Sequence, residues 1–265
     1  TPLWSYYRTS SGQLMLMLVL GLFLGALYWL RNDVADWRTA DRTSEVYNPA
    51  TGQVTGALDL ASASVVDEVV KHASAAAKQW GATSLAKRTP VLFKFRQLLD
   101  ENKERIAALI TAEHGKVTSD ALGEVTRGLE VAEFACGIPQ LLKGGYSENV
   151  STGVDAYSIL QPLGVVAVIS PFNFPAMVPL WFVPIAVACG NAVVIKPSEK
   201  DPSATLEVAK LWQEAGLPDG VMNVVHGDKE AVDALLDHRD VKAVSFVGST
   251  PIAKYVYERG VAAGK

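Results

Sequence analysis

The 265-residue sequence has few cysteines and no concentrated basic segment. Its two cysteines, Cys136 and Cys189, are far apart in the chain and form neither a CxxC nor a Cys/His metal-ligand spacing. We expect both thiols to be buried, reduced and structural, which suits a reducing compartment and a cytoplasmic location for the body of the protein. The formal charge is −4, and no Lys/Arg block is present to neutralise phosphates, so we expect no nucleic-acid partner.

One run near the N-terminus is uncharged and strongly apolar. Leu14 to Leu30 is 17 residues without a charge, the short limit for a membrane span. Aromatic residues lie at both ends, and Gly21 and Gly25 form a GxxxG pattern. Residues 1–43 therefore read as an apolar leader and a linker. Three interpretations of 14–30 remain open: a membrane anchor, an uncleaved signal-like segment, or a stretch foreign to the functional protein.

Three stretches in the first half of the body have apolar residues at helical spacing. The first contains Val66, Val69, Val70, Ala73, Ala77 and Trp80, the second Leu92, Phe95, Leu99, Ile106 and Leu109, and the third Leu122, Val125, Leu129 and Ala132. These stripes predict helices that face a core. We expect the Glu and Lys residues of these helices to be solvated.

After Gly153, hydrophobic strands alternate with amphipathic helices. We predict strands at 164–170, 191–198, 220–227 and 241–249, and helices at 203–216, at 229–238 and after Pro251, with Ser203 as a helix cap. This alternation is typical of the α/β class, with a parallel sheet covered on both faces. Because the alternation of strands and helices continues up to Lys265, we expect the α/β domain within 44–265 to be incomplete at its C-terminus.

Ligands of such sheets bind beyond the carboxyl ends of the strands. The polar residues after the four predicted strands are Ser170 and Asn173, Lys196 and Glu199, His226 and Asp228, and Gly248, Ser249 and Thr250. Neither GxGxxG nor GxxxxGK[ST] occurs in the sequence. The segment 248–251 is instead typical of a helix N-terminus that binds an anion such as a pyrophosphate, or of an ordinary capped helix.

Lys196 and Glu199 are both able to hydrogen-bond ribose hydroxyls, and Glu199 would repel a 2′-phosphate, which favours NAD over NADP. The alternative is a surface ion pair. His226, at a strand end, is a weak site candidate, whereas we expect His72, His114 and His238 to lie at the surface.

Asn173 lies between two Phe-Pro pairs at a strand end. Its side-chain amide is a suitable donor to an oxygen that gains negative charge during attack on a carbonyl. Alternatively it is a turn residue bonded to its own backbone. Arg127, on the third predicted helix, is either a bidentate ligand for a carboxylate or a solvated surface residue.

These residues and their neighbouring motifs resemble the aldehyde dehydrogenase superfamily and, within it, the CoA-acylating methylmalonate-semialdehyde dehydrogenases. The resemblance runs from about Thr43 to Lys265. It rests on the segments YNPATG, AEHGK, RGLEVAEFACGIP, ENVSTGVDAYS, QPLGVV, PFNFPAMVPLW, CGNAVVIKPSEKDPS, GLPDGVMNVVHG and SFVGS.

The resemblance implies a Rossmann-like NAD domain, a catalytic domain, a small oligomerisation domain and a homotetramer. It assigns the oxyanion amide to Asn173 and the substrate carboxylate to Arg127. The NAD contacts it implies fall on Ser170, Phe172, Lys196, Glu199, Lys200 and Ser249. The implied reaction is NAD-dependent oxidation of malonate or methylmalonate semialdehyde, with loss of CO2, to acetyl-CoA or propionyl-CoA through a cysteine thioester, with CoA as co-substrate.

The sequence departs from this pattern at the nucleophile. In the family the catalytic cysteine lies downstream of SFVGS, and this chain has no cysteine after Cys189. We therefore interpret 44–265 as the N-terminal, NAD-binding portion of such a dehydrogenase, with the catalytic domain missing, and expect the 265 residues alone to be inactive. Two rival interpretations are a non-CoA aldehyde dehydrogenase for another acidic semialdehyde and a membrane-tethered, non-catalytic nucleotide-binding protein.

Overall fold

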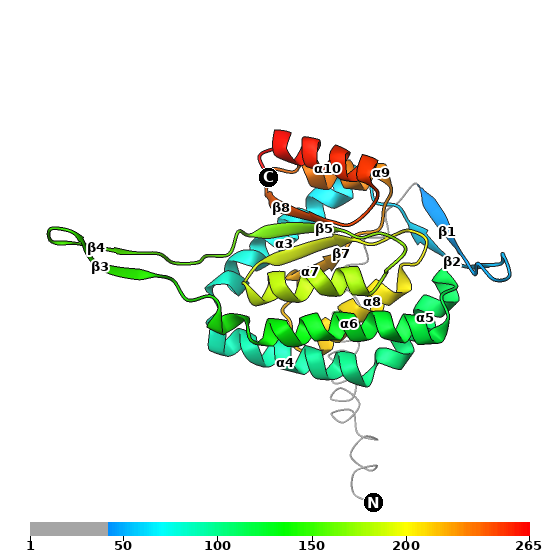
Figure 1. Cartoon of the computed structure of the whole chain (residues 1–265). Coiled ribbons are helices and arrows are strands. Elements are labelled where there is room, and N and C mark those ends of the chain that lie inside the picture. The colour runs from blue at the N-terminus through cyan, green and yellow to red at the C-terminus, as the bar shows by residue number, and fades with distance from the viewer. Residues whose placement is uncertain (1–41) are drawn as a thin grey trace, which may run out of the picture. The chain divides into compact units, whose positions relative to one another are not determined.

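The computed structural model describes residues 42–265, which contain a four-stranded parallel sheet between layers of helices (Figure 1). The strands are β5 Val165–Ile169, β6 Ala192–Lys196, β7 Met222–Val224 and β8 Val241–Phe246, in the spatial order β7-β6-β5-β8. Every residue of β5 and β6 is buried, as expected of short β-branched runs in a sheet covered on both faces. The predicted α/β class is confirmed, with strands shorter than predicted.

Helices cover both faces of this sheet. One face carries α3 Ala63–Ala82 and α9 Lys229–Asp237, and the other carries α7 Met177–Ala188 and α8 Ser203–Glu214 (Figure 1). An outer layer on α7 and α8 consists of α4 Leu85–Glu101, α5 Lys103–His114 and α6 Thr118–Cys136, followed by the short 3-10 helix η1 Ile138–Gln140. The last helix, α10 Thr250–Ala262, follows β8 and packs on α9.

Successive side chains of a strand point to opposite faces of the sheet, so they pack into two different cores, each covered by its own helices. Val166 and Val168 of β5 join the core that contains α7 and α8, whereas Ile169 packs with Leu236 of α9 and Val256 of α10. The apolar stripes predicted in the first half of the body are buried as expected, except that Leu109 and Leu122 are only partly buried.

Two predicted helix boundaries are wrong. The single pattern over 92–109 is two helices, because Asn102 lies between α4 and α5 and its side-chain amide donates to the Leu98 carbonyl at 2.8 Å. Ser203 is the first residue of α8 and not its cap, since its hydroxyl donates to Glu113 of α5. Both differences arise from polar contacts that hydrophobic periodicity does not encode.

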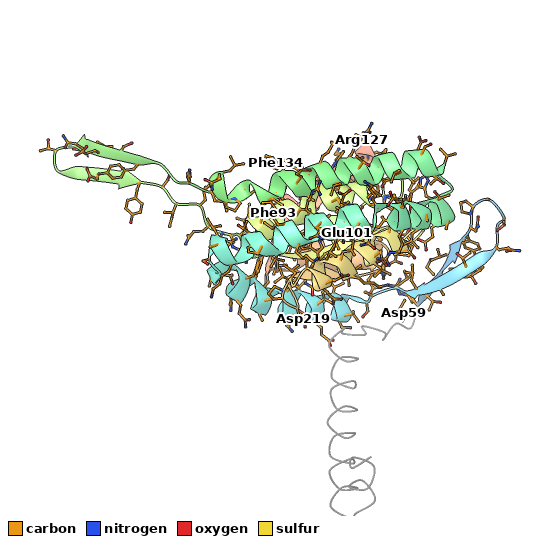
Figure 2. The ribbon with its side chains drawn as sticks, turned by 90° about the horizontal axis from the view of Figure 1, so that it is seen from below. Asp59, Phe93, Glu101, Arg127, Phe134 and Asp219 are labelled. Carbon is orange, nitrogen blue, oxygen red and sulfur yellow. The ribbon has the colours of Figure 1, made fainter. Side chains whose placement is uncertain are left out.

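Two antiparallel hairpins were not predicted. β1 Thr43–Tyr47 pairs with β2 Val54–Asp59, and β3 Tyr146–Ser151 pairs with β4 Val154–Tyr157. All residues of β3 and β4 are exposed, and this hairpin extends away from the layered body (Figures 1 and 2). Such strands lack the half-buried alternation that identifies a strand in sequence.

The apolar segment 14–30 and its proposed membrane anchor lie outside the described residues. Within 42–265, no helix is long and apolar enough to cross a membrane.

Candidate functional site

The carboxyl ends of β5 and β6 bring three of the predicted site residues together. The backbone N–H of Ser170 donates to the Lys196 carbonyl at 3.1 Å. The Lys196 ammonium donates to the Gly227 carbonyl at 3.0 Å and lies 3.2 Å from a Glu199 carboxylate oxygen. Lys196 is only 6% exposed, so an ordinary surface ion pair does not describe it. Its charge is held at the sheet edge by the end of β7 and by Glu199.

The strand order places a topological switch point beside Ser170. The chain passes from β5 to β6 and β7 on one side and then returns to add β8 on the other side of β5. In open parallel sheets the crevice at such a reversal is where ligands bind. In this chain the loops at the reversal are 170–173 after β5 and 247–249 after β8. The Val247 N–H donates to the Ile169 carbonyl at 3.4 Å.

Three of the four helices that follow these strands already have a carboxylate at their N-terminus. Glu124 accepts from the first N–H groups of α7, and Glu113 accepts from the Ser203 N–H of α8. Asp228 caps α9 and also pairs with Arg42 at 2.7 Å. By contrast, α10 has Ser249 as its cap, without a side-chain bond, and Ser249 is exposed. Of these helices, α10 is therefore the one with N–H groups available to an external anion.

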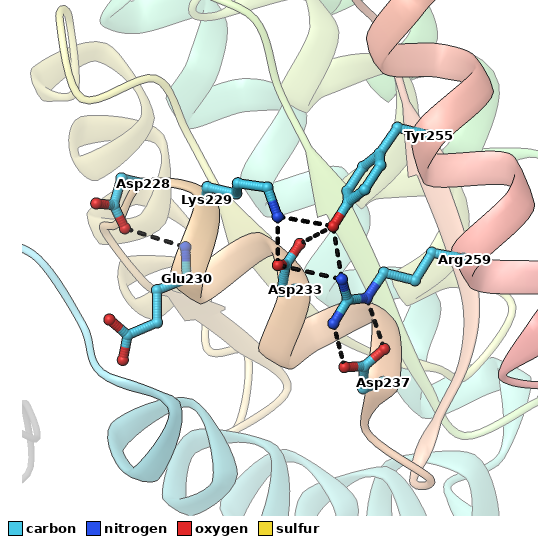
Figure 3. A network of polar contacts seen from close by, with 7 residues as sticks. All are labelled: Asp228, Lys229, Glu230, Asp233, Asp237, Tyr255 and Arg259. Carbon is cyan, nitrogen blue, oxygen red and sulfur yellow. Dashed lines mark hydrogen bonds and ion pairs between the residues drawn. The ribbon is translucent and has the colours of Figure 1, made fainter.

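A polar network holds α10 against α9 (Figure 3). The Tyr255 hydroxyl donates to Asp233 at 2.7 Å and accepts from Lys229 at 2.8 Å and Arg259 at 2.6 Å. Arg259 also binds Asp237 through two nitrogen atoms, at 2.7 and 2.5 Å. A bidentate network of this kind fixes orientation better than an isolated surface pair does, so the N-terminus of α10 has a defined position relative to α9.

Phe172 and Lys200 lie together over the edge of the sheet. The Lys200 ammonium is 4.9 Å from the centre of the exposed Phe172 ring, and the His114 ring lies 6.1 Å from it on α5. His114 is half-buried, and burial lowers the pKa of its imidazole. The surface prediction is therefore wrong for His114. It is also wrong for His238, whose side chain is 12% exposed beside Asp67.

Asn173 is exposed, and within residues 42–265 its side-chain amide makes no hydrogen bond. The alternative of a turn residue bonded to its own backbone is therefore not supported. Its backbone carbonyl, in contrast, accepts a hydrogen bond from the Lys116 ammonium at 2.9 Å. The backbone is held while the amide remains available.

Arg127 projects from α6 and is exposed (Figure 2). Its guanidinium has no ion pair or hydrogen bond in the part of the chain that is described. It lies one turn after Glu124, which caps α7. The proposed binding of a carboxylate by Arg127 stays a prediction.

Some of the buried polar atoms without a partner follow strands of the sheet. Within the described residues they include the Ser170 hydroxyl after β5, both Asp201 carboxyl oxygens after β6 and the His226 Nδ1 after β7. Burial lowers the pKa of His226 to about 4, with the nearby Lys196 charge acting in the same direction, so its imidazole is neutral. Buried polar groups are normally hydrogen-bonded. The unpartnered Ser170 hydroxyl at the end of β5 is therefore available to a polar ligand, and a ribose hydroxyl fits it.

Neither cysteine has the features of an activated nucleophile. Cys136 is 8% exposed and Cys189 is half-buried, less than we expected of the latter. Burial raises the pKa of both thiols. Activated thiolates have a lowered pKa, so both cysteines are structural.

Sequence reasoning missed the carboxylates that cap helices across the fold. Glu124 is 3% exposed, and the expectation that the Glu residues of these helices are solvated is wrong for it. A signal was present, because Glu124 lies directly beside Val125 on the apolar stripe of its helix. A charge on a stripe that faces a core requires a buried partner.

Comparison with known proteins agrees with this geometry. The aldehyde dehydrogenase family pattern matches residues 37–265. A malonate-semialdehyde dehydrogenase of Pseudomonas aeruginosa is 54% identical over 244 residues, which cover 91% of this chain and 48% of the relative. A malonate-semialdehyde dehydrogenase of Geobacillus kaustophilus is 48% identical over 224 residues, covering 84% of this chain and 46% of the relative.

Similar solved structures indicate the same family. The methylmalonate-semialdehyde dehydrogenase of Oceanimonas doudoroffii matches with a TM-score of 0.83 and 57% identity over 85% of this chain and 46% of that chain. A structure described as a methylmalonate-semialdehyde dehydrogenase of Sinorhizobium meliloti, complexed with NAD, matches with a TM-score of 0.84 and 52% identity. The match covers 86% of this chain and 46% of that chain. The chain spans about half the length of the relatives it matches. The predicted resemblance and fold are confirmed, and the chain belongs to the aldehyde dehydrogenase family.

Proposed function

We propose that this chain supplies the NAD-binding part of a CoA-acylating semialdehyde dehydrogenase, which converts malonate or methylmalonate semialdehyde to acetyl-CoA or propionyl-CoA. The observation that carries the proposal is the sheet edge where Ser170, Lys196 and Glu199 meet beside the free N-terminus of α10. The relative from Sinorhizobium meliloti, which was solved with NAD, supports the choice of cofactor.

In this proposal each group at the edge has a distinct task. Lys196 and Glu199 bind ribose hydroxyls, the unpartnered Ser170 hydroxyl completes its bonding there, and the N–H groups after Ser249 receive the pyrophosphate. Phe172 and Lys200 flank the same site. NAD, when bound, supplies the hydride acceptor. The Glu199 carboxylate disfavours the additional phosphate of NADP by charge repulsion.

Asn173 and Arg127 act on the substrate in this proposal. The Asn173 amide donates to the oxyanion that forms when a thiolate attacks the aldehyde. The Arg127 guanidinium pairs with the substrate carboxylate. Since Cys136 and Cys189 are structural, we propose that the 265 residues bind NAD without turning over the semialdehyde.

The assembly and location follow the family resemblance. We propose a homotetramer in the cytoplasm, where the two unpaired thiols remain reduced. A membrane association through 14–30 stays a prediction.

The nucleotide preference tests the proposal directly. Calorimetric titration of the 265-residue chain is expected to show tighter binding of NAD than of NADP. Glu199→Gln is expected to change the NADP-to-NAD affinity ratio by about tenfold in favour of NADP. The reason is that repulsion between two unit charges at short range contributes about 1 kcal/mol or more to the binding free energy. Glu214→Gln, at the C-terminal end of α8, is the matched control and should leave the ratio unchanged.

Equal affinity for the two nucleotides in the unmodified chain would contradict the assignment of Glu199. Production of NADH by the 265 residues, given malonate semialdehyde, NAD and CoA, would contradict the expected inactivity.

A further inference from the structure

The backbone at Asn173 and just after it is held by side chains from three other parts of the fold. The Lys116 ammonium donates to the Asn173 carbonyl at 2.9 Å. Glu124 accepts from the Ala176 N–H at 2.9 Å and from the Met177 N–H at 3.0 Å. The Thr205 hydroxyl of α8 donates to the Pro175 carbonyl at 2.9 Å. Residues 173–177 thus follow a path fixed by tertiary contacts.

Glu124 uses both of its carboxylate oxygens for this purpose. One accepts the two N–H groups at the start of α7, and the other lies 2.5 Å from the Lys116 ammonium. Its side chain is only 1% exposed. A buried carboxylate is stable when it is paired and fully hydrogen-bonded, and the N-terminus of a helix adds a favourable dipole.

Lys116 connects this cap to Asn173. Its side chain is 12% exposed, and its ammonium lies 4.4 Å from the centre of the Phe174 ring. The same nitrogen contacts Glu124 and the Asn173 carbonyl. Rotation of the peptide after Asn173 would therefore break a charge-assisted hydrogen bond.

We propose that Lys116 and Glu124 are positioning residues for the Asn173 amide. They anchor the main chain at Asn173 and just after it, so that the side-chain N–H2, which has no hydrogen bond within the described residues, projects from a fixed backbone position. A donor whose backbone is held in advance needs less reorganisation to stabilise a developing oxyanion. The catalytic meaning rests on the proposed function, whereas the anchoring of residue 173 does not.

A simple helix cap would need only Glu124, so Lys116 is the informative residue. In the 265-residue chain we compare Lys116→Met with the conservative Lys116→Arg, and with Lys143→Met at an exposed position as the control. Two signals are measured by NMR: hydrogen exchange of the Ala176 and Met177 amides, and the resonances of the Asn173 side-chain N–H2.

Lys116→Met is expected to speed exchange of both amides by at least about tenfold and to shift the Asn173 side-chain resonances, because a buried carboxylate loses its partner. Lys116→Arg should restore most of both signals, and Lys143→Met should change neither. Unchanged Asn173 resonances in Lys116→Met would overturn the proposal, even if the helix amides exchange faster. Glu124→Gln gives a second test, since it keeps an acceptor for α7 but removes the charge that holds Lys116.

The same samples separate this proposal from the proposed function. If the unmodified chain fails to bind NAD while Lys116→Met still shifts the Asn173 resonances, the anchoring stands and the dehydrogenase assignment falls. If NAD binds and the Asn173 resonances do not shift in Lys116→Met, the anchoring proposal is contradicted and the proposed function is not.

Discussion

Trp212→Ala is expected to lower the free energy of unfolding by about 3–5 kcal/mol. Trp212 lies on α8 and is fully buried, and its ring stacks on Phe95 of α4 with 3.6 Å between ring centres and 5° between planes. The pair joins the helix layer on the sheet to the outer layer. Truncation leaves a cavity between them, because neither helix is free to collapse into it while the sheet and the other helices hold their positions.

Trp212→Phe is the informative comparison. Within the described residues the Trp212 indole N–H has no hydrogen-bond partner, so replacing it by a phenyl ring removes an unsatisfied donor while keeping most of the apolar contact. We expect it to cost less than about half as much as Trp212→Ala. Urea unfolding of both variants measures the difference. If both variants lost the same free energy of unfolding, the aromatic contact that Trp212→Phe keeps would not contribute to joining the two layers.

Asp201→Asn is expected to stabilise the chain, by an amount that grows with pH. Asp201 is 2% exposed, and neither carboxyl oxygen has a hydrogen-bond partner of normal geometry in the described chain. Its pKa is raised to about 7, mainly by burial; the neighbouring Glu113 and Glu124 contribute to the rise, while Ser198 and Lys116 oppose it.

The sign of the effect follows from proton binding. An unfolded Asp has a pKa of about 3.9, so between about pH 4 and pH 7 the folded chain binds more protons than the unfolded chain. The free energy of unfolding therefore falls as the pH rises through that window. A shift of roughly three pKa units corresponds to about 4 kcal/mol.

Urea unfolding at pH 5 and pH 8 measures this prediction. Asn does not titrate, so Asp201→Asn should be more stable than the unmodified chain by about 2–4 kcal/mol at pH 8 and by much less at pH 5. The exposed Asp219 provides the control through Asp219→Asn, which should show no such pH dependence. An equal effect of Asp201→Asn at both pH values would contradict a carboxyl that is protonated by burial.

The sheet and its edge were predictable because their signals are local. A short, β-branched run such as Val165–Ile169 is typical of a strand covered on both faces. Once the strands are placed, the carboxyl ends of parallel neighbours must share an edge, so Ser170 and Lys196 were expected to meet. The same reasoning placed Ser249 at the N-terminus of the last helix.

The contacts that shape the site were not predictable, because their partners are distant in the chain. Glu113 caps a helix 90 residues away, and Glu124 caps one that begins about 50 residues later. Periodicity assigns both residues to helices but does not say what lies opposite them. The break at Asn102 and the exposed β3–β4 hairpin were missed for a related reason, since neither has an apolar pattern of its own.

We propose that a dinucleotide binds beyond the carboxyl ends of β5 and β8. Amide chemical-shift mapping on the 265-residue chain, titrated with NAD, tests it most directly. We predict that the largest shifts fall at 170–173, 196–200 and 249–252, with small changes on the outer helices α4 and α5. Largest shifts outside that edge, or no saturable shifts at all, would contradict the assignment.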